Sequence, residues 1–416
     1  LPPLGAGGLR VVNLALLGTL MLTLVAIVRR AAIAMTPGYD ALTYHLPMVV
    51  SMIKQHHLRP WATYIPIVYS YPKSVQLYMT WVLGFFGHDR WIDLSQLPFL
   101  PLAMLAVYCI ARHLRAARAA ALTGALLFPF CPVVLMQLTT CYIDLATAAL
   151  LLAAIGLLLI YARHAQWWTW LMFSASLGLL LGTKFAAVYQ VAVLLTAGIC
   201  VGRRISPVWR ALVATGVVLA VGGETYLHNA IERGNPFFPA HGDIAGLVQC
   251  AGGWDPTKIA GLVGLADLTP LQRIAASWAY VEHVGHTGPF AGLGMMWPVA
   301  MLFILAAVLL AIRRCQRRAL LVAALFALLF PLTPLNFRAR FVIFMLGLSG
   351  ACVALVLDHV ARLRAWRGPM MALTAAVCLA MPAITIRQVA PRLAADVVGD
   401  GGARTAPYDD VTTAGA

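Results

Sequence analysis

Charged residues are scarce in this sequence, and their scarcity excludes a water-soluble protein. Only 11% of the 416 residues are charged, whereas 61% are hydrophobic. Soluble globular proteins carry about 25% charged residues. The few charges are unbalanced, with 30 Lys and Arg against 15 Asp and Glu. Because the arginines lie in short clusters between apolar runs, they are typical of membrane-topology signals, and nucleic acid is not an expected partner.

The sequence also lacks the common motifs of several enzyme classes. It contains no phosphate-binding loop of the Walker type, no paired CxxC, no HExxH and no GxSxG. These absences count against an ATP-driven pump, a zinc protease and a serine hydrolase. Alternating segments of about ten residues, which would indicate a lipid-facing barrel, are absent as well.

Long uncharged runs take the place of these motifs and predict an all-α polytopic membrane protein. Each run of about 20 residues is long enough to cross a bilayer as a helix. We expect a transmembrane domain over residues 1–388 and a flexible tail over 389–416. The predicted spans, about eleven in number, lie near 11–28, 94–111, 119–138, 145–162, 167–183, 186–202, 211–228, 291–312, 319–333, 341–357 and 369–386.

The basic clusters predict how these spans are oriented. With eleven spans, four arginine clusters fall on the same, cytoplasmic side. Two long loops, 29–93 and 229–290, then face the opposite, outer side. In the first, segments 41–57 and 72–87 predict amphipathic helices at the membrane surface. Arg29 and Arg30 break the pattern, because they fall outside. The four clusters are 112, 115 and 118; 203, 204 and 210; 313, 314, 317 and 318; and 362, 364 and 367.

Two acidic residues stand out on the outer side. Asp144 interrupts an uncharged stretch from Ala119 to Ala162, where two predicted spans must turn. Asp40 follows Pro37 and Gly38 in the first outer loop. Either carboxylate could simply cap the helix that begins beside it. An ionisable group at membrane depth is, however, a candidate functional residue.

Basic residues also occur on the outer side, where the orientation rule disfavours them. Lys184 could be a lysine whose long side chain reaches lipid headgroups. The alternative is that several outer cations hold an anionic ligand such as a lipid phosphate. The cations in question are Lys73, Lys184, Arg338 and Arg340. Outer histidines would allow a metal site, but their spacing does not favour one, and we expect no metal or other cofactor.

Several segments resemble the GT-C glycosyltransferases, polytopic enzymes that use polyprenyl-phosphate sugars. The resemblance is closest to bacterial members related to protein mannosyltransferases and to the aminoarabinose transferase of lipid A. It runs over about residues 9–345. The segments that carry it are GYDALTYHLPMV at 38–49, YPKSVQLY at 71–78, RHLRAARAAALTGALLFPFCPVVLMQLTTCYIDLATAALLL at 112–152, LGLLLGTKFAA at 177–187, ERGNPFFP at 232–239 and LNFRARF at 335–341.

This resemblance implies a GT-C-like bundle in a bacterial inner membrane, with its active site facing the periplasm. The implied activity is an inverting transfer of a hexose or pentose from a polyprenyl-phosphate donor to a glycan, lipid or protein acceptor. Asp40 would be the general base and Asp144 a second catalytic carboxylate. Lys73, Lys184, Arg338 and Arg340 would hold the donor phosphate. Further donor or acceptor contacts are assigned to Tyr44, His45, Asn229, Glu232 and Asn235.

One departure from the family pattern and two other functions remain open at this stage. Many members carry an Asp-Glu pair in the first outer loop, whereas here Ala41 follows Asp40. Asp89 or Asp93 could supply the missing charge. The main alternative function is a transporter or flippase of a lipid-linked or anionic solute, for which Glu224 is the best argument. A noncatalytic membrane scaffold is the third.

Overall fold

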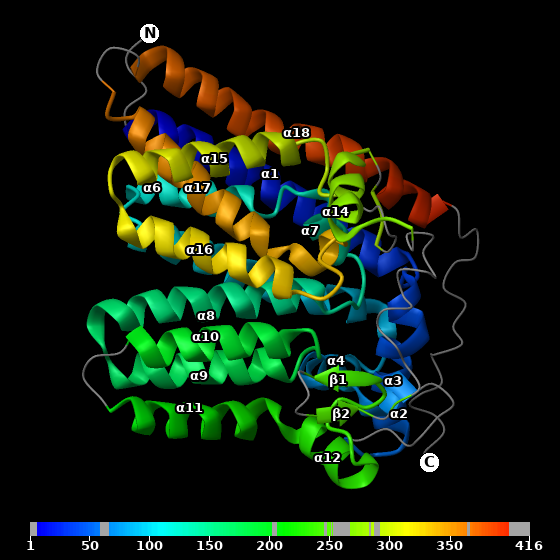
Figure 1. Ribbon diagram of the computed structural model, residues 1–416. Coiled ribbons are helices and arrows are strands. Elements are labelled where there is room, and N and C mark those ends of the chain that lie inside the picture. The colour runs from blue at the N-terminus through cyan, green and yellow to red at the C-terminus, as the bar shows by residue number, and fades with distance from the viewer. Residues whose placement is uncertain are drawn as a thin grey trace.

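The computed structural model describes residues 6–58, 66–201, 206–244, 248–250, 252, 267–282, 284–286, 292–363 and 367–398. Its described part is a bundle of long helices capped at one end by short helices and one pair of strands (Figure 1). The elements are α1 (Ala6–Ile33), η1 (Ala41–His45), α2 (Leu46–Lys54), α3 (Pro66–Ser70), α4 (Ser74–Phe86), η2 (Asp89–Gln96), α5 (Phe99–His113), α6 (Arg118–Leu127), α7 (Pro132–Gln137), α8 (Asp144–His164), α9 (Trp167–Leu181), α10 (Ala187–Val201), α11 (Pro207–Gly222), α12 (Glu224–Arg233), β1 (Gly242–Ile244), β2 (Val248–Cys250), α14 (Pro270–Ala279), α15 (Trp297–Arg313), α16 (Arg317–Leu332), η4 (Ala339–Val342), α17 (Phe344–Val360) and α18 (Arg367–Val398).

The helices agree with a multi-pass membrane protein. Four helical segments are long and apolar enough to cross a bilayer, namely Gly8–Ile33, Asp89–His113, Asp144–His164 and Gly368–Ala394. Six shorter apolar helices accompany them in the described part. Each of the eleven predicted segments overlaps at least one helix, while the number that spans the membrane stays a prediction.

Close packing of the bundle depends on small residues where helices cross. α8 lies inside it and packs against α5 and α9, so that most of its side chains are buried. α6 crosses α17 at Gly124 and Gly350, and a Cβ atom on Gly124 would overlap the carbonyl oxygen of Gly350. Only glycine lets these two backbones approach so closely.

Three segment boundaries differ from the predictions. The span predicted at 211–228 is wrong at its end: α11 stops at Gly222, and the chain bends by 76° into α12. The span predicted at 119–138 is divided at Pro129 and Pro132 into two helices, α6 and α7, because proline cannot continue a helix interior. Finally, α18 continues to Val398, past the predicted start of the tail at 389. Residues 399–416 lie outside the described part.

All the helix ends that carry the described arginine clusters lie together at one end of the bundle, on the left of Figure 1. The first residues of α8, α10 and α17, together with the short helices, lie at the other end. Arg30, the exception to the charge pattern, is buried at this second end and donates a hydrogen bond to the carbonyl oxygen of Thr139 (3.0 Å). Arg30 therefore joins the end of α1 to the segment before α8, and this structural role explains why it departs from the charge pattern that predicts membrane orientation.

Candidate active site

Asp40 is held in place by the segment that precedes α8. The hydroxyl of Thr140 donates to the carbonyl oxygen of Pro37 (2.6 Å). The backbone N–H of Asp40 donates to the hydroxyl oxygen of Tyr142 (3.2 Å). Between these two contacts Gly38 has φ +101°, and a Cβ atom there would lie 2.6 Å from the Tyr142 hydroxyl. The turn thus requires glycine, because L-residues with side chains disfavour this backbone region.

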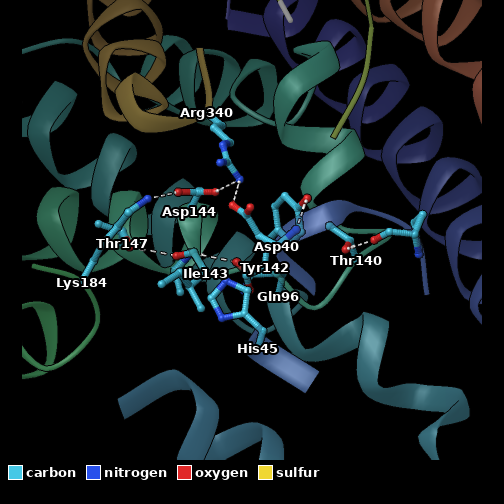
Figure 2. A network of polar contacts seen from close by, with 12 residues as sticks. Asp40, His45, Gln96, Thr140, Tyr142, Ile143, Asp144, Thr147, Lys184 and Arg340 are labelled. Carbon is cyan, nitrogen blue, oxygen red and sulfur yellow. Dashed lines mark hydrogen bonds and ion pairs between the residues drawn. The ribbon is translucent and has the colours of Figure 1, made fainter. Parts of the chain in front are cut away.

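Neither carboxylate caps a helix. Asp40 precedes η1 and Asp144 begins α8, but neither side chain makes a capping hydrogen bond. Both carboxylates instead face cations, as Figure 2 shows. Helix capping, the simplest structural explanation for these two acids, is therefore wrong.

Arg340 and Lys184 bring the two carboxylates into one network. Arg340, on η4, places Nη1 2.6 Å from Oδ2 of Asp40 and 3.6 Å from Oδ2 of Asp144. Lys184, in the turn between α9 and α10, places Nζ 2.6 Å from Oδ1 of Asp144. The ring of Phe341 lies beside both cations, 3.5 Å from Nζ of Lys184 and 4.9 Å from the guanidinium carbon of Arg340. Lys184 is thus an ion-pair partner, and its side chain is only 17% exposed.

The network is electrically balanced by itself and carries one further cation beside it. Burial raises the pKa of the Asp40 carboxyl, but the charge and hydrogen bond of Arg340, with smaller contributions from His45 and Lys184, outweigh burial, and the net pKa lies below the ordinary value. Burial lowers the pKa of Arg338, and the like charge of Arg340 lowers it further. Within the described part of the chain no ion pair involves Arg338, and its buried Nε has no hydrogen-bond partner. Two acids, two paired bases and Arg338 leave a local charge of +1, which suits an anionic ligand.

Aromatic and amide side chains surround this network. The His45 ring lies 4.2 Å from that of Tyr44 and 6.0 Å from that of Tyr142, and its Nδ1 is hydrogen-bonded to the Gln76 amide (2.8 Å). Burial lowers the pKa of His45 to about 4, so its ring is neutral at pH 7. Burial likewise raises the pKa of Tyr44 well above its ordinary value. Both side chains are therefore neutral hydrogen-bonding groups near the Asp40 carboxylate.

A small cavity opens beside the ion pairs. It is bounded by Asp144, Lys184 and Arg340, by the ring of Phe341 and by the polar side chains of Thr147, Gln190 and Thr333, with apolar residues of α8 and α17 below. Gln190 donates to the hydroxyl oxygen of Thr333 (3.1 Å). The cavity has a volume of about 10 Å³, so it has room for about one water molecule beside the cations.

Three residues that position the carboxylates were not singled out from the sequence. Tyr142 and Thr140 hold the Asp40 loop. Gln96 is fully buried, donates to the carbonyl oxygen of Tyr142 and accepts from the N–H of Ala146 (3.0 Å). No local pattern marks these residues, since each acts on a segment distant in the sequence.

Lys73 lies next to the network but has a different partner. It precedes α4 and forms an ion pair with Glu224 (3.0 Å), the first residue of α12. The N–H of Ser74 donates to the carbonyl oxygen of Gly182 (2.8 Å), which places the start of α4 against the Lys184 turn. The structure therefore brings Lys73 close to Lys184 but does not pair it with Asp40 or Asp144. Glu224 lies after the bend at Gly223, at the end of the bundle and not at its middle.

The three predicted contacts of the second long loop make internal bonds. Asn229 is buried and donates to the carbonyl oxygens of Ser70 (2.9 Å) and Phe238 (3.4 Å). Asn235 binds the backbone of its own turn. Glu232 lies 3.2 Å from His228 on the exposed side of α12. These contacts shape the loop and do not place the three side chains at the ion pairs.

No group of three or more His, Cys, Asp or Glu side chains is arranged to hold a metal in the residues that the structure describes. Metal independence nevertheless stays a prediction.

The comparisons with known proteins define the fold. The chain matches no protein-family model and no curated protein. It is similar in structure to the Archaeoglobus fulgidus oligosaccharyltransferase in complex with zinc and sulfate (16% identity, TM-score 0.53, 91% of this chain and 53% of that chain). It is also similar to ArnT from Cupriavidus metallidurans bound to undecaprenyl phosphate (13% identity, TM-score 0.53, 92% of this chain and 77% of that chain).

A third similar structure is the archaeal oligosaccharyltransferase AglB from Archaeoglobus fulgidus in complex with an inhibitory peptide and a dolichol-phosphate (14% identity, TM-score 0.52, 92% of this chain and 56% of that chain). The chain spans about half the length of the archaeal enzymes. The fold predicted from the sequence, that of the GT-C membrane glycosyltransferases, is thereby confirmed. At these identities the likeness establishes the fold alone, and the activity has to be argued from the site.

Proposed function

We propose that this protein is a membrane glycosyltransferase that moves a sugar from a polyprenyl-phosphate donor to an acceptor hydroxyl or amine, with inversion at the anomeric carbon. The observation that carries the proposal is the buried network in which two carboxylates share two cations, with Arg338 beside them. A leaving phosphate needs cations, and an attacking nucleophile needs a carboxylate base. The lipid phosphates bound to ArnT and AglB are consistent with such a donor.

In the proposed reaction the donor phosphate binds Arg340, Arg338 and Lys184. Asp40 takes the proton of the acceptor as its oxygen or nitrogen forms a bond to the anomeric carbon. The bond from that carbon to the phosphate oxygen breaks, and polyprenyl phosphate leaves with both bonding electrons. A single displacement of this kind inverts the anomeric configuration. Asp144 keeps Lys184 oriented toward the phosphate.

The Asp40–Arg340 ion pair sets the sequence of steps: the donor binds before Asp40 acts as a base. While Arg340 is bound to Asp40, the pKa of Asp40 is low and the carboxylate is a weak base. A phosphate that draws Arg340 away raises the pKa of Asp40 toward its ordinary value. Asp40 therefore becomes an effective base only once the donor is bound, and this arrangement disfavours reactions without a donor.

The test is turnover of a defined donor by the purified protein. With a polyprenyl-phosphate sugar and an acceptor mixture, the wild type should release polyprenyl phosphate and give a product of inverted anomeric configuration. Asp40→Asn should lower release by about 10³-fold or more, given the usual contribution of a general base. Asp267→Asn removes an exposed carboxylate outside the ion-pair network and is the matched control.

Two results would contradict the proposal. Full release by Asp40→Asn would remove Asp40 as the base. Transport of labelled lipid between leaflets without any glycosidic product would favour the transporter. The ion pair of Glu224 with Lys73, at the end of the bundle that carries the short helices, favours a transferase over a transporter site at mid-membrane.

A further inference from the structure

A second polar site lies at the opposite end of the bundle from the carboxylates. Four arginines from three separate turns line one hollow of about 370 Å³, and no carboxylate is among the described residues around it. Arg112 lies in the last turn of α5, Arg115 follows that helix, Arg163 lies in the last turn of α8, and Arg318 lies in the first turn of α16. Arg115, Arg163 and Arg318 are exposed, so the hollow is open to its surroundings.

The position of this hollow relative to the membrane follows from α8. Asp144 begins that helix and Arg163 lies one residue before its end, with 21 residues in all. At 1.5 Å per residue the two positions are about 30 Å apart, which is the thickness of the hydrocarbon core. The arginines therefore lie at the level of the headgroups of one leaflet when Asp40 and Asp144 lie at the other.

The preference of cations for the C-terminal ends of helices does not explain the positions of all four arginines. A cation in the last turn of a helix is favoured by the helix dipole, which accounts for Arg112 and Arg163 individually. Arg318 is at the start of its helix, where the dipole disfavours a cation. Arg115 has φ +72°, a backbone region that costs a non-glycine residue free energy. Membrane orientation accounts for basic residues at this end of the bundle, and Arg112 donates to the carbonyl oxygen of Ala116. Orientation does not require that Arg115 and Arg318 occupy unfavourable positions around one hollow, and this convergence suits an anionic occupant.

A neighbouring hollow of about 190 Å³ indicates what kind of anion this is. Arg115 lines both hollows. The second has an apolar wall formed by Leu114, Ala307, Leu310 and Leu355, beneath a polar rim. In that rim Arg362 is paired with Asp358 (2.8 Å), and Arg314 is hydrogen-bonded to His359 (2.6 Å). The positive charges of Arg115 and Arg314 are therefore left without a carboxylate partner among the described residues of this hollow. An anion with an adjoining hydrocarbon chain matches this combination of basic and apolar surface.

We propose that these two hollows bind one anionic phospholipid of the surrounding bilayer. Its phosphate lies among Arg112, Arg115, Arg163 and Arg318, and part of an acyl chain lies against the apolar wall. Basic pockets between membrane helices are suited to such headgroups. This site is independent of the proposed glycosyl transfer, because it involves none of the residues at Asp40 and Asp144.

The experiment measures lipid binding by the delipidated, detergent-solubilised protein. Native mass spectrometry compares phosphatidylglycerol with phosphatidylcholine at about 0.15 M salt, where general surface attraction is screened. The wild type should bind phosphatidylglycerol preferentially. The pair Arg163→Gln and Arg318→Gln should reduce that binding by about tenfold or more. The control pair Arg313→Gln and Arg317→Gln removes two exposed charges at the same end, outside both hollows, and should change it by less than about twofold.

Three outcomes would overturn the proposal. Unchanged preference in the Arg163 and Arg318 pair would show that the hollow is not the site. An equal loss in the control pair would show that only net charge matters. Displacement of the lipid by millimolar inorganic phosphate would assign the site to a soluble anion. Thermal unfolding of each variant, measured beside the wild type, separates lost binding from lost folding.

Discussion

Arg340 is the residue whose replacement tests the proposed site most directly, because it contacts both carboxylates. Its side chain is 8% exposed, and it lies 2.6 Å from Asp40 and 3.6 Å from Asp144. Unit charges about 4 Å apart interact by roughly 4 kcal/mol at an effective dielectric constant near 20. Removal of one partner from a buried pair costs about 3–5 kcal/mol.

Two features reduce that cost here. The Asp40 side chain is 16% exposed, so water recovers part of its solvation. Asp144 keeps Lys184 as its partner. We therefore expect Arg340→Gln to lower the free energy of unfolding by about 2–4 kcal/mol. It should also abolish release of polyprenyl phosphate, because Gln carries no charge for the leaving group.

A double-mutant cycle separates the ion pair from general damage. Stability is measured for Arg340→Gln, for Asp40→Asn and for the two combined, in the same detergent. If the pair exists, the combined variant is less destabilised than the sum of the single ones, with a coupling of at least about 1.5 kcal/mol. Activity stays absent in all three. A coupling below about 0.5 kcal/mol would refute the pairing, and retained turnover in Arg340→Gln would refute its role toward the phosphate.

Two further predictions concern the groups that hold Asp40. Gly38→Ala should destabilise the protein by about 2–4 kcal/mol, since its φ is +101° and its Cβ would overlap the Tyr142 ring; the loss should be smaller in a Tyr142→Phe background, and equal losses in both backgrounds would contradict the overlap. Burial lowers the pKa of His45 to about 4, so between about pH 6.5 and pH 4 the unfolded chain takes up a proton that the folded chain does not. Stability should fall by about 3 kcal/mol over this interval as pH falls, and His45→Gln should flatten that part of the pH profile of thermal unfolding; an unchanged slope would show that His45 is not responsible.

The sequence predicted those parts of the structure that depend on local patterns. Uncharged runs marked the helices, because burial in a bilayer requires each span to be apolar along its length. The arginine clusters marked one end of the bundle. Asp40, Asp144, Lys184 and Arg340 were recognisable as outer charges in a chain with few of them, and they form one network in the structure.

Contacts between segments that are distant in the sequence could not be predicted from local patterns. Tyr142 and Gln96 are uncharged residues whose effect depends on which segments the fold places beside them. Lys73 has the same local setting as Lys184, an outer turn between apolar runs, yet it pairs with Glu224 because the chain bends at Gly223. Asn229 was predicted to contact a ligand, and in the structure its side chain joins α12 to the end of α3 through the carbonyl oxygen of Ser70.

The structure explains why position 41, where many GT-C enzymes carry a second acid, is occupied by alanine. Ala41 is fully buried and packs in an apolar cluster with Tyr142 and Ile143. A carboxylate at this position would have to enter that cluster. The second carboxylate at Arg340 comes from Asp144 on α8, and the proposal that Asp89 or Asp93 supplies the missing charge stays a prediction.

Replacement of Ala41 tests this reasoning. Ala41→Glu places an unpartnered carboxyl group in an apolar cluster and should destabilise the protein by at least about 3 kcal/mol, through overpacking together with desolvation. Ala41→Ser adds a single oxygen and should cost about 1–2 kcal/mol at most. Thermal unfolding measures both. If Ala41→Glu instead kept wild-type stability and turned over donor only with a divalent metal, position 41 would face the site and not the apolar cluster.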